Sequence, residues 1–423
     1  MSAPLNVTVI GAGIVGAATA LRLAQSGHRV TILEPGQPGG EQSASYGNGC
    51  WLSPSSVVPM SLPGIAKKVP GFLRDPLGPL VIRPAYLPRM AGWLWRFIAA
   101  GSTVAKVEKT ARALRPLVED APAQHAAIAA DAGVGHLIHR QGILYIFPDR
   151  AAFEAEALAW RLRRDNGVQW LEIEADELRQ REPALDRRYN FAVLVEAGGH
   201  CTDPGLLVGA LARAAQQAGA VVRSERARGF RVVGGRLTHV RTEAGLVPAD
   251  RAVIAAGAHS RTLAAQVGDA VPLETERGYH AQIIDPPDGA GPRTPTMPSD
   301  GKMSITRMDG GLRCAGQVEL AGLEAAPNWQ RAAILRDFLL KLYPDLPRDL
   351  PAERIKVWMG HRPSIADGLP VIGPARDCRD VVHAFGHGHV GLAAGPKTAA
   401  WVAALIEGRD PGVDLSPYSA QRF

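Results

Sequence analysis

Residues 7–34 constrain the fold of this chain most, because they combine an apolar run, a glycine turn and a helix-forming stretch in one fixed order. Gly11, Gly13 and Gly16 stand at G-x-G-x-x-G spacing directly after the apolar run. In a strand–turn–helix unit, such glycines allow a tight turn, a close approach of the backbone to a pyrophosphate, and close packing of the helix on the strand. The stretch therefore predicts a dinucleotide-binding unit with a diphosphate on the N-terminus of the helix.

Glu34 supports this prediction from the end of a second apolar run. An acid about 20 residues beyond the glycines can accept hydrogen bonds from both hydroxyls of an adenosine ribose. The same carboxylate would repel a 2′-phosphate, which disfavours NADP. Glycine is common in this chain, at 46 of 423 residues, so the spacing gains its meaning from the strand, helix, second strand and acid around it.

The amino-acid composition limits the classes of function that this chain can have. With 46% hydrophobic and 21% charged residues, the chain is typical of a globular protein with two or three domains. The net charge of +6 is not gathered into a Lys/Arg-rich run with interleaved aromatics, so we expect no nucleic-acid partner. The start of the chain has no basic region followed by an apolar core, and no run of 18 apolar residues occurs, so we expect a cytoplasmic protein.

The cysteines carry no spacing typical of a metal site or of a disulfide framework, and we expect them to be isolated core residues. They are Cys50, Cys201, Cys314 and Cys378.

Further elements follow from local patterns. Asp203 and Pro204 indicate the start of a helix, and residues 221–258 contain strands that we expect to extend the nucleotide-binding sheet. Alternating runs at 273–284 and 303–320 predict an antiparallel sheet, followed by a helix at 328–342. Residues 86–130 are predicted to be helical; the tryptophans near their start favour a buried helix face, with membrane contact as the alternative.

A second G-x-G-x-x-G sequence occurs at Gly386, Gly388 and Gly391. Glu407, the acid that follows it, is predicted to end a helix and not a strand, so the context of a second dinucleotide site is missing. We interpret this turn as a helix N-terminus whose free N–H groups face an electron-rich ring.

Several motifs resemble, in kind and in order, those of the FAD-dependent D-amino-acid oxidase family. They are the glycine fingerprint with Glu34, the loop at 43–53, the Asp203–Pro204 helix start, the strand that ends at 255–258, the segment 362–373 and the turn at 386–391. Within the family, the chain is most similar to the D-amino-acid dehydrogenase small-subunit branch.

The resemblance implies an α/β (α+β) fold in which a Rossmann-like FAD-binding domain is interleaved with a substrate domain of mainly antiparallel sheet plus helices. The expected FAD-binding domain comprises 1–85, 200–270 and 351–423, and the substrate domain 86–199 and 271–350. The implied FAD-binding residues are Gly11, Gly13, Ile14, Val15, Gly16, Glu34, Ser43, Asn48, Gly49, Leu52, Ala227, Ala256, Gly257, His387, Gly388, Val390, Gly391 and Leu392. No metal site is expected.

Arg362 is the preferred substrate ligand, because a guanidinium offers a planar fork that matches a carboxylate. A surface salt bridge is the alternative role, and Tyr279 is expected either to cover the substrate or to lie in the core. Other arginines compete for the carboxylate, namely Arg277, Arg307 and Arg313. The histidines considered as a general base are His361, His387 and His389.

The resemblance implies oxidation of a small D-amino or imino acid by hydride transfer from Cα to flavin N5, giving an imino acid that hydrolyses to a 2-oxo acid. Neutral D-amino acids, proline-like imino acids, and sarcosine or glycine all remain open as substrates, with oxygen or a quinone as electron acceptor. Two alternatives are an FAD-holding electron-relay subunit with a partner chain, and an NAD-linked dehydrogenase. A peripheral position at the inner face of the membrane is the alternative to the cytoplasmic location.

Overall fold

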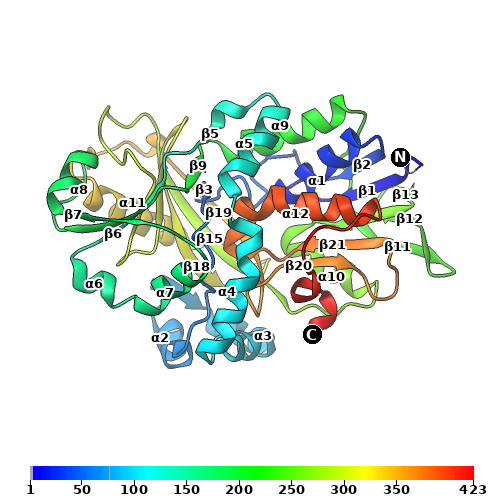
Figure 1. Cartoon of the computed structure of the whole chain (residues 1–423), viewed down its shortest axis with the longest axis horizontal. Coiled ribbons are helices and arrows are strands. Elements are labelled where there is room, and N and C mark those ends of the chain that lie inside the picture. Colours follow the sequence, from blue (N-terminus) through cyan, green and yellow to red (C-terminus); the bar gives the residue numbers. More distant parts are fainter. Residues whose placement is uncertain (1–2, 76) are drawn as a thin grey trace.

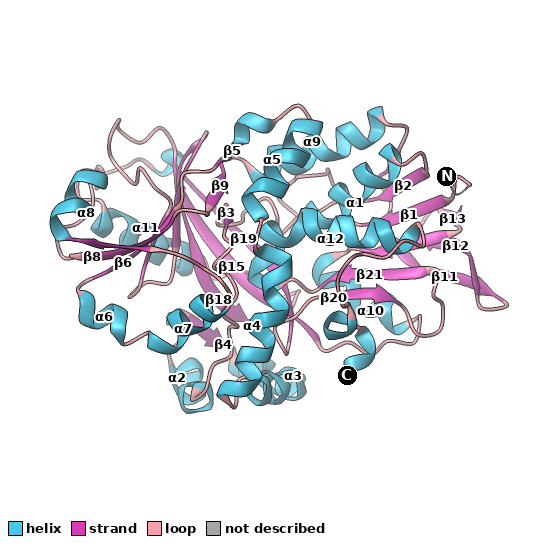
Figure 2. Ribbon diagram, in the orientation of Figure 1, coloured by secondary structure: helices cyan, strands magenta, loops and turns pink. Residues whose placement is uncertain are grey.

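The computed structural model describes residues 3–75 and 77–423 and forms an elongated molecule with two lobes (Figure 1). One lobe contains both ends of the chain: the blue strands near the N-terminus lie beside the orange and red elements near the C-terminus. The other lobe contains mostly the middle of the chain. Figure 2 shows a sheet flanked by helices in the first lobe and a large twisted sheet in the second.

The first lobe is built on a six-stranded sheet. Its order is β10 (Val221–Arg223), β2 (Arg29–Leu33), β1 (Asn6–Ile10), β14 (Arg251–Ile254), β21 (Val381–Phe385) and β20 (Val371–Pro374). All neighbouring pairs are parallel except β20 with β21. Residues 7–10 of β1 are buried on both faces, as expected of a central parallel strand.

Helices cover one face of this sheet, and a small sheet covers the other. The helices are α1 (Ile14–Gln25), α9 (Pro204–Gln217) and α12 (Gly391–Ile406), with α1 in contact with both others. The small sheet has the order β11 (Ala227–Val233), β12 (Arg236–Thr242) and β13 (Gly245–Pro248), and α10 (Ser260–Ala265) lies in the same core. Asp203 caps α9 as predicted, by accepting from the N–H of Leu206. The expectation that all strands of 221–258 extend the main sheet is wrong for β11, β12 and β13.

The second lobe is built on a nine-stranded sheet. Its main path is β19 (Ile355–Ile365), β15 (Leu273–Ile283), β18 (Gly311–Leu320), β17 (Ser304–Met308), β16 (Thr296–Pro298), β6 (Ile143–Phe147), β8 (Phe191–Val195) and β7 (Leu171–Glu174), and β4 (Leu80–Ile82) pairs with β18. Helix α11 (Gln330–Leu342) packs on β15 and β18, and α6 (Arg150–Glu154), α7 (Ala157–Asp165) and α8 (Ala175–Arg181) complete the lobe. β4 and β19 come from ranges expected in the FAD-binding domain, yet they hydrogen-bond into this sheet; the domain boundaries stay a prediction.

The remaining elements are a small antiparallel sheet and four helices. The sheet has the order β3 (Trp51–Leu52), β9 (Gly199–Cys201) and β5 (Ile138–His139), and the helices are α2 (Val69–Arg74), α3 (Leu87–Ala100), α4 (Val104–Val118) and α5 (Ala121–Asp131). The predicted helical region at 86–130 is therefore three helices. It breaks at Gly101, and α4 restarts where Thr103 caps it by accepting from Lys106 N–H.

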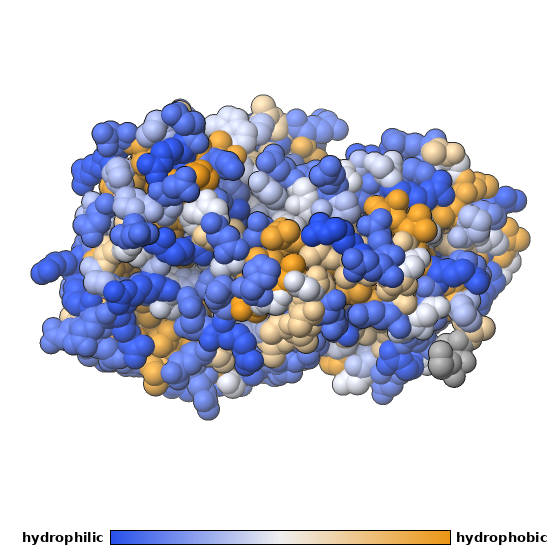
Figure 3. All heavy atoms as spheres, turned by 90° about the horizontal axis from the view of Figure 1, so that it is seen from above, coloured by the Kyte–Doolittle hydropathy of each residue, from blue (hydrophilic) through white to orange (hydrophobic). Residues whose placement is uncertain are grey.

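Helix α3 buries Met90, Trp93 and Phe97 and exposes Trp95, so one face of it packs in the core as favoured by the sequence. Within residues 3–75 and 77–423, no helix is both long enough and apolar enough to cross a bilayer. On the face shown in Figure 3, hydrophilic residues cover most of the surface and hydrophobic ones form small separate patches.

Candidate active site

The glycine turn between β1 and α1 has the shape that the sequence predicts. Gly11 has φ +99°, and a Cβ there would lie 2.5 Å from the carbonyl oxygen of Ala255. A Cβ on Gly16 would lie 1.9 Å from the carbonyl oxygen of Gly11, so neither position accepts a side chain. Helix α1 starts after Gly13 with no side-chain cap and no acid in its first turn. Its N-terminus is therefore suited to an anionic group.

Glu34 lies at the end of β2 and is only 8% exposed. Its Oε2 accepts a 2.9 Å hydrogen bond from the Ala12 N–H, and its Oε1 accepts one of 3.1 Å from Gly36 N–H. Oε1 also accepts a longer hydrogen bond, of 3.5 Å, from Gln42 Nε2, whereas Oε2 keeps a second lone-pair direction that can accept from a hydroxyl group. The acid therefore holds the glycine turn and suits a ribose at the same time.

Sequence reasoning missed His259, which interacts through charge with Glu34 and with Arg226. Burial lowers the pKa of His259, the charge of Arg226 lowers it further, and Glu34 partly raises it. His259 ends the short 3-10 helix that starts at Gly257, directly after β14. No short motif marks this histidine. Ala227, expected near the adenine, is the first residue of β11 and directly follows Arg226.

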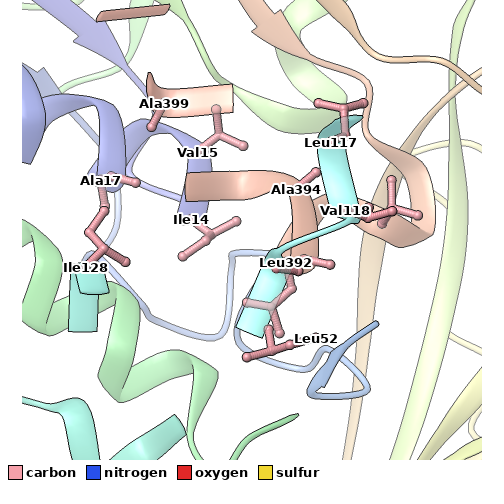
Figure 4. Packing of buried hydrophobic residues seen from close by; sticks show 14 of the residues in the cluster. Ile14, Val15, Ala17, Leu52, Leu117, Val118, Ile128, Leu392, Ala394 and Ala399 are labelled. Carbon is pink, nitrogen blue, oxygen red and sulfur yellow. The ribbon is translucent and has the colours of Figure 1, made fainter. Parts of the chain in front are cut away.

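The loop at 43–52 connects the glycine turn to the second lobe. At the turn, Ser45 Oγ accepts from the N–H of Ile14 at 3.1 Å, and Ser43 Oγ would lie 3.5 Å from a Cβ on Gly13. Further along, Leu52 is fully buried and packs in one cluster with Ile14 and with Leu392 of α12 (Figure 4).

The middle of this loop rests on the face of the nine-stranded sheet. Arg313 of β18 donates to the carbonyl oxygens of Tyr46 and Asn48, at 3.0 and 3.1 Å. Thr306 Oγ1 donates to the carbonyl of Gly49 at 3.2 Å. A Cβ on Gly47 would lie 1.9 Å from the ring of Trp358, so this contact requires glycine. The loop thus joins the two lobes at the expected FAD position.

The turn at 386–391 gives a second uncapped helix N-terminus. Gly388 has φ +53°, a short 3-10 helix covers Gly388–Val390, and α12 follows without a side-chain cap or an acid in its first turn. Glu407 is the C-cap of α12, as the sequence predicts, so the second glycine pattern lacks the strand that a dinucleotide site needs. The ring of His387 is fixed by Thr398 Oγ1 at 2.9 Å, and burial lowers its pKa to about 4.

Arg362 is on β19, directly opposite Glu276 on β15. Its guanidinium lies over Gly278, where a Cβ would meet Cζ at 2.3 Å. The two terminal nitrogens donate to the carbonyls of Gln317 and Gly316, at 2.9 and 3.4 Å, which fixes the plane of the fork. Burial lowers the pKa of Arg362 and the charge of Glu276 opposes this shift. Arginine remains charged in proteins, so the half-buried group can bind an anion.

The competing arginines are engaged by backbone carbonyl groups. Arg277 is fully buried and donates to Gly322 O at 2.8 Å, Arg313 holds the loop described above, and Arg307 donates to Ala290 O at 2.5 Å. Arg362 also donates to two backbone carbonyls, but it is more exposed than the buried Arg277 and Arg313, and its charge acts on His389 at the cavity, so it remains the preferred partner of a substrate carboxylate.

Tyr279 and His361 lie on the face of the strands opposite to Arg362, and for Tyr279 this is the core position that was one of its two expected roles. Adjacent residues of a strand point to opposite faces. Tyr279 is 1% exposed and its hydroxyl donates to Glu319 Oε2 at 2.6 Å, within the core below α11. His361 Nδ1 lies 2.9 Å from Thr275 Oγ1, and burial lowers its pKa to about 4.

His389, like His387, lines a cavity, and the charge of Arg362 acts on its ring. It is exposed to a narrow cavity whose lining includes Phe97, Thr110 and Ser364, the last of these two residues beyond Arg362 on β19. Burial, followed by the charge of Arg362, lowers the pKa of His389 to about 4. The ring is therefore neutral near pH 7 and can accept a hydrogen bond.

Comparison with known proteins decides the family. Residues 6–405 match the DAO family, whose description is FAD dependent oxidoreductase. The chain belongs to this family. The DAO match also decides between the two dinucleotides in favour of FAD, and the sequence-based prediction of family, fold class and cofactor is confirmed.

Among DAO-family relatives, a D-amino-acid oxidase of Bradyrhizobium diazoefficiens is 54% identical over 418 residues, covering 99% of both chains. The D-amino acid dehydrogenase 2 of Ralstonia nicotianae is 32% identical, covering 99% of this chain and 100% of its own. Glycine oxidase from Geobacillus kaustophilus shares the fold with a TM-score of 0.73 at 23% identity, covering 99% of both chains.

The residues present fit FAD. Two helix N-termini without an acid in the first turn, on the packed helices α1 and α12, are suited to the diphosphate and to the electron-rich edge of the flavin. The glycines at positions 11 and 16 let the turn pack against β14 and let α1 pack on the turn, which brings the N-terminus of α1 to the end of β1. Glu34 is suited to the ribose.

Proposed function

We propose that this DAO-family chain oxidises a small D-amino or imino acid at the bond between Cα and nitrogen. The imino acid formed would be hydrolysed by water to a 2-oxo acid. The observation that carries the proposal is the half-buried guanidinium of Arg362, which two backbone carbonyls hold in a fixed orientation. It lies on the face of the nine-stranded sheet that the loop at 43–52 covers. The 54% identity to a D-amino-acid oxidase over nearly the whole chain supports the substrate class.

FAD, when bound, supplies the acceptor for the hydride that leaves Cα. The chain binds and orients the reactants around it. In the proposal the N-terminus of α1 holds the diphosphate, Glu34 holds the ribose, and the N-terminus of α12 donates toward the pyrimidine edge. Arg362 holds the substrate carboxylate in its fork. Positioning of this kind, together with fixed charges, supplies most of the rate.

Most of the other residues proposed to bind FAD belong to three segments: the start of α1, the loop at 43–52 and the turn before α12. Ile14 and Val15 start α1, the loop contributes Ser43, Asn48, Gly49 and Leu52, and the turn before α12 contributes His387, Gly388, Val390, Gly391 and Leu392. Ala256 and Gly257 follow β14, where a bare backbone passes next to Gly11. The cytoplasmic location, and a quinone or oxygen as acceptor, belong to the proposal as well.

Anaerobic mixing of the FAD-loaded protein with single substrates tests the proposal. A panel of neutral D-amino acids, D-proline, glycine and sarcosine should bleach the flavin absorbance with at least one member, whereas the L-enantiomers should not. Arg362→Ala should raise the substrate concentration needed for half-maximal bleaching by about 100-fold or more, because a charge-assisted bidentate contact is lost. Bleaching by no member of the panel would overturn the proposal.

Reoxidation separates the two acceptors. The reduced protein is exposed to air in one experiment and to a soluble quinone without oxygen in the other. Rapid return of the flavin absorbance in air supports an oxidase, as the name of the 54% identical relative suggests. Return only with quinone supports a dehydrogenase that delivers electrons to a partner or to a membrane pool.

A further inference from the structure

A buried carboxylate with no assigned role lies beside Arg362. Glu276 and Arg362 are directly opposite each other on the antiparallel strands β15 and β19, so their side chains share one face of the sheet. Glu276 is 4% exposed, and its Oε1 accepts a 2.7 Å hydrogen bond from Ser364 Oγ. Ser364 also lines the cavity that contains His389. The acid is thus buried and is held by a residue that lines the cavity.

The two opposite charges are neighbours without being paired. Among the residues that the structure describes, no ion pair joins Arg362 to Glu276, and no donor reaches Glu276 Oε2. Arg362 is held by carbonyl oxygens instead. A guanidinium and a carboxylate that are adjacent but not paired match the carboxylate and the ammonium group of an amino acid, respectively. In the amino acid, both groups are attached to the same carbon atom, Cα.

We propose that Glu276 is the second anchor of the substrate: its Oε2 binds the ammonium group of the amino acid whose carboxylate Arg362 holds, and it takes the proton that the amine must lose. The inference rests on the proposed function and deepens it. One N–H bond of the ammonium breaks, the proton bonds to Oε2, and the electron pair stays on nitrogen. The neutral amine is then the species from which hydride leaves Cα in the proposed reaction.

The surroundings of Glu276 suit this role. Burial raises its pKa, while the Ser364 hydrogen bond and the charge of Arg362 oppose the rise. The titratable groups of the facing turn, His387 and His389, have pKa values lowered by burial to about 4 and are neutral near pH 7. On β15 itself, Glu274 is held by Tyr86 Oη at 3.0 Å. Arg362 is therefore the charge that faces Glu276 among these groups.

The inference also predicts selectivity. A primary or secondary amine has an N–H to donate to Glu276, so amino acids and cyclic imino acids both fit. A 2-hydroxy acid carries no cation, and a quaternary ammonium group has no N–H to donate or to lose, so compounds of both kinds should be poor substrates. Simple carboxylates such as propanoate should bind to Arg362 and leave Glu276 without a partner.

The test compares D-alanine and propanoate on the FAD-loaded wild type and on Glu276→Gln. Dissociation constants are read from the change in the flavin spectrum on binding, and reduction by D-alanine is followed without oxygen. In the variant, propanoate should bind at least as tightly as in the wild type. Flavin reduction should be slower by about 100-fold. The plot of the reduction rate against pH should no longer show the ionisation that belongs to Glu276. Glu274→Gln, on the same face of the same strand, should leave the pH dependence unchanged.

Three results would overturn the inference: reduction of Glu276→Gln at the wild-type rate, an unchanged pH profile, or an equal loss of propanoate and D-alanine binding, which would make Glu276 only a support for Arg362. If Glu276→Gln does not retain FAD, Ser364→Ala decides instead. Loss of the Ser364 donor should raise the apparent pKa in the pH profile, and an unchanged value would contradict the proposal. Failure of the wild type to be reduced by any substrate would count against the proposed function itself.

Discussion

Glu34 Oε2 accepts a 2.9 Å hydrogen bond from the backbone N–H of Ala12, so the acid at the end of β2 fixes the turn at the end of the neighbouring strand β1. Its other oxygen accepts from Gly36 N–H. One buried carboxylate therefore joins two segments that both border the expected nucleotide. The side chain of Glu34 therefore contributes both to the shape of the expected ribose site and to its negative charge.

Glu34→Ala should weaken FAD binding by about 10-fold or more, since it removes the ribose acceptor and leaves the Ala12 N–H unpaired. The affinity is measured by quenching of flavin fluorescence on titration of the apoprotein. Glu243→Ala, at an exposed acid on the β12–β13 hairpin, is the matched control and should bind as the wild type does. Equal affinity in both variants would assign the ribose to another group.

Gly16→Ala and Gly92→Ala should have opposite effects on stability, although both glycines lie within helices. The new Cβ at Gly16 would meet Gly11 O at 1.9 Å, so the variant should lose about 3 kcal/mol or more of unfolding free energy. Nothing lies within 4 Å of a Cβ at Gly92 on exposed α3, so that variant should gain about 0.5–1 kcal/mol. Urea unfolding of the two apoproteins checks both signs.

Arg313→Met should release the loop at 43–52 from the nine-stranded sheet. The substitution removes the donors to Tyr46 O and Asn48 O and leaves these carbonyls without their partner, which costs about 2–4 kcal/mol. We expect lower FAD content and faster proteolysis within the loop. Arg231→Met on exposed β11 is the control, and wild-type FAD content in Arg313→Met would contradict the role.

Asp269→Asn should lower the free energy of unfolding at neutral pH. It should also make this free energy fall less steeply as the pH decreases. Burial raises the pKa of Asp269, but hydrogen bonds from His383 Nε2 at 2.8 Å and from Arg376 N–H lower it to below its usual 3.8. A lowered pKa in the folded state adds stability above the unfolded value, and this stability is lost as the pH falls through the folded value. Urea unfolding at a series of pH values should show that the variant is about 1–3 kcal/mol less stable than the wild type near neutral pH. The difference between the two proteins should be smaller at acid pH.

The four cysteines should react with a thiol reagent only after unfolding. All are buried and free. Burial raises the pKa of Cys50 to about 11, and it raises those of Cys201 and Cys314 as well, so little thiolate forms near neutrality. Absorbance after addition of a disulfide reagent should stay flat in buffer and rise by four thiols in denaturant. A rapid release in buffer would contradict the buried placement.

The elements that the sequence predicted well are those with local causes. The β1–α1–β2 unit and Glu34 follow from glycine spacing and from two apolar runs, and Asp203 caps α9 through a contact within one turn. The break of 86–130 into three helices was missed, because Gly101 is tolerated inside a helical pattern and only the structure shows α3 ending there.

The candidate site was harder to predict, because it depends on strand pairing. Arg362 was found from its motif, whereas Glu276 was missed because its partner comes from β19, far along the chain. Tyr279 and His361 carry suitable chemistry, but strand alternation places them on the far face. The irregular register between Arg277 and Tyr279 on β15 is a further feature that no sequence pattern marks.

The order of strands in the six-stranded sheet has a consequence for how the protein is made. β1 lies between β2 and β14, β14 pairs with β21, and α12 covers α1, so elements from both ends of the chain form one cofactor site. On a ribosome, the first strands leave the exit tunnel long before their partners exist. We expect flavin capture to wait until α12 has left the ribosome, because the site lacks one of its walls before then.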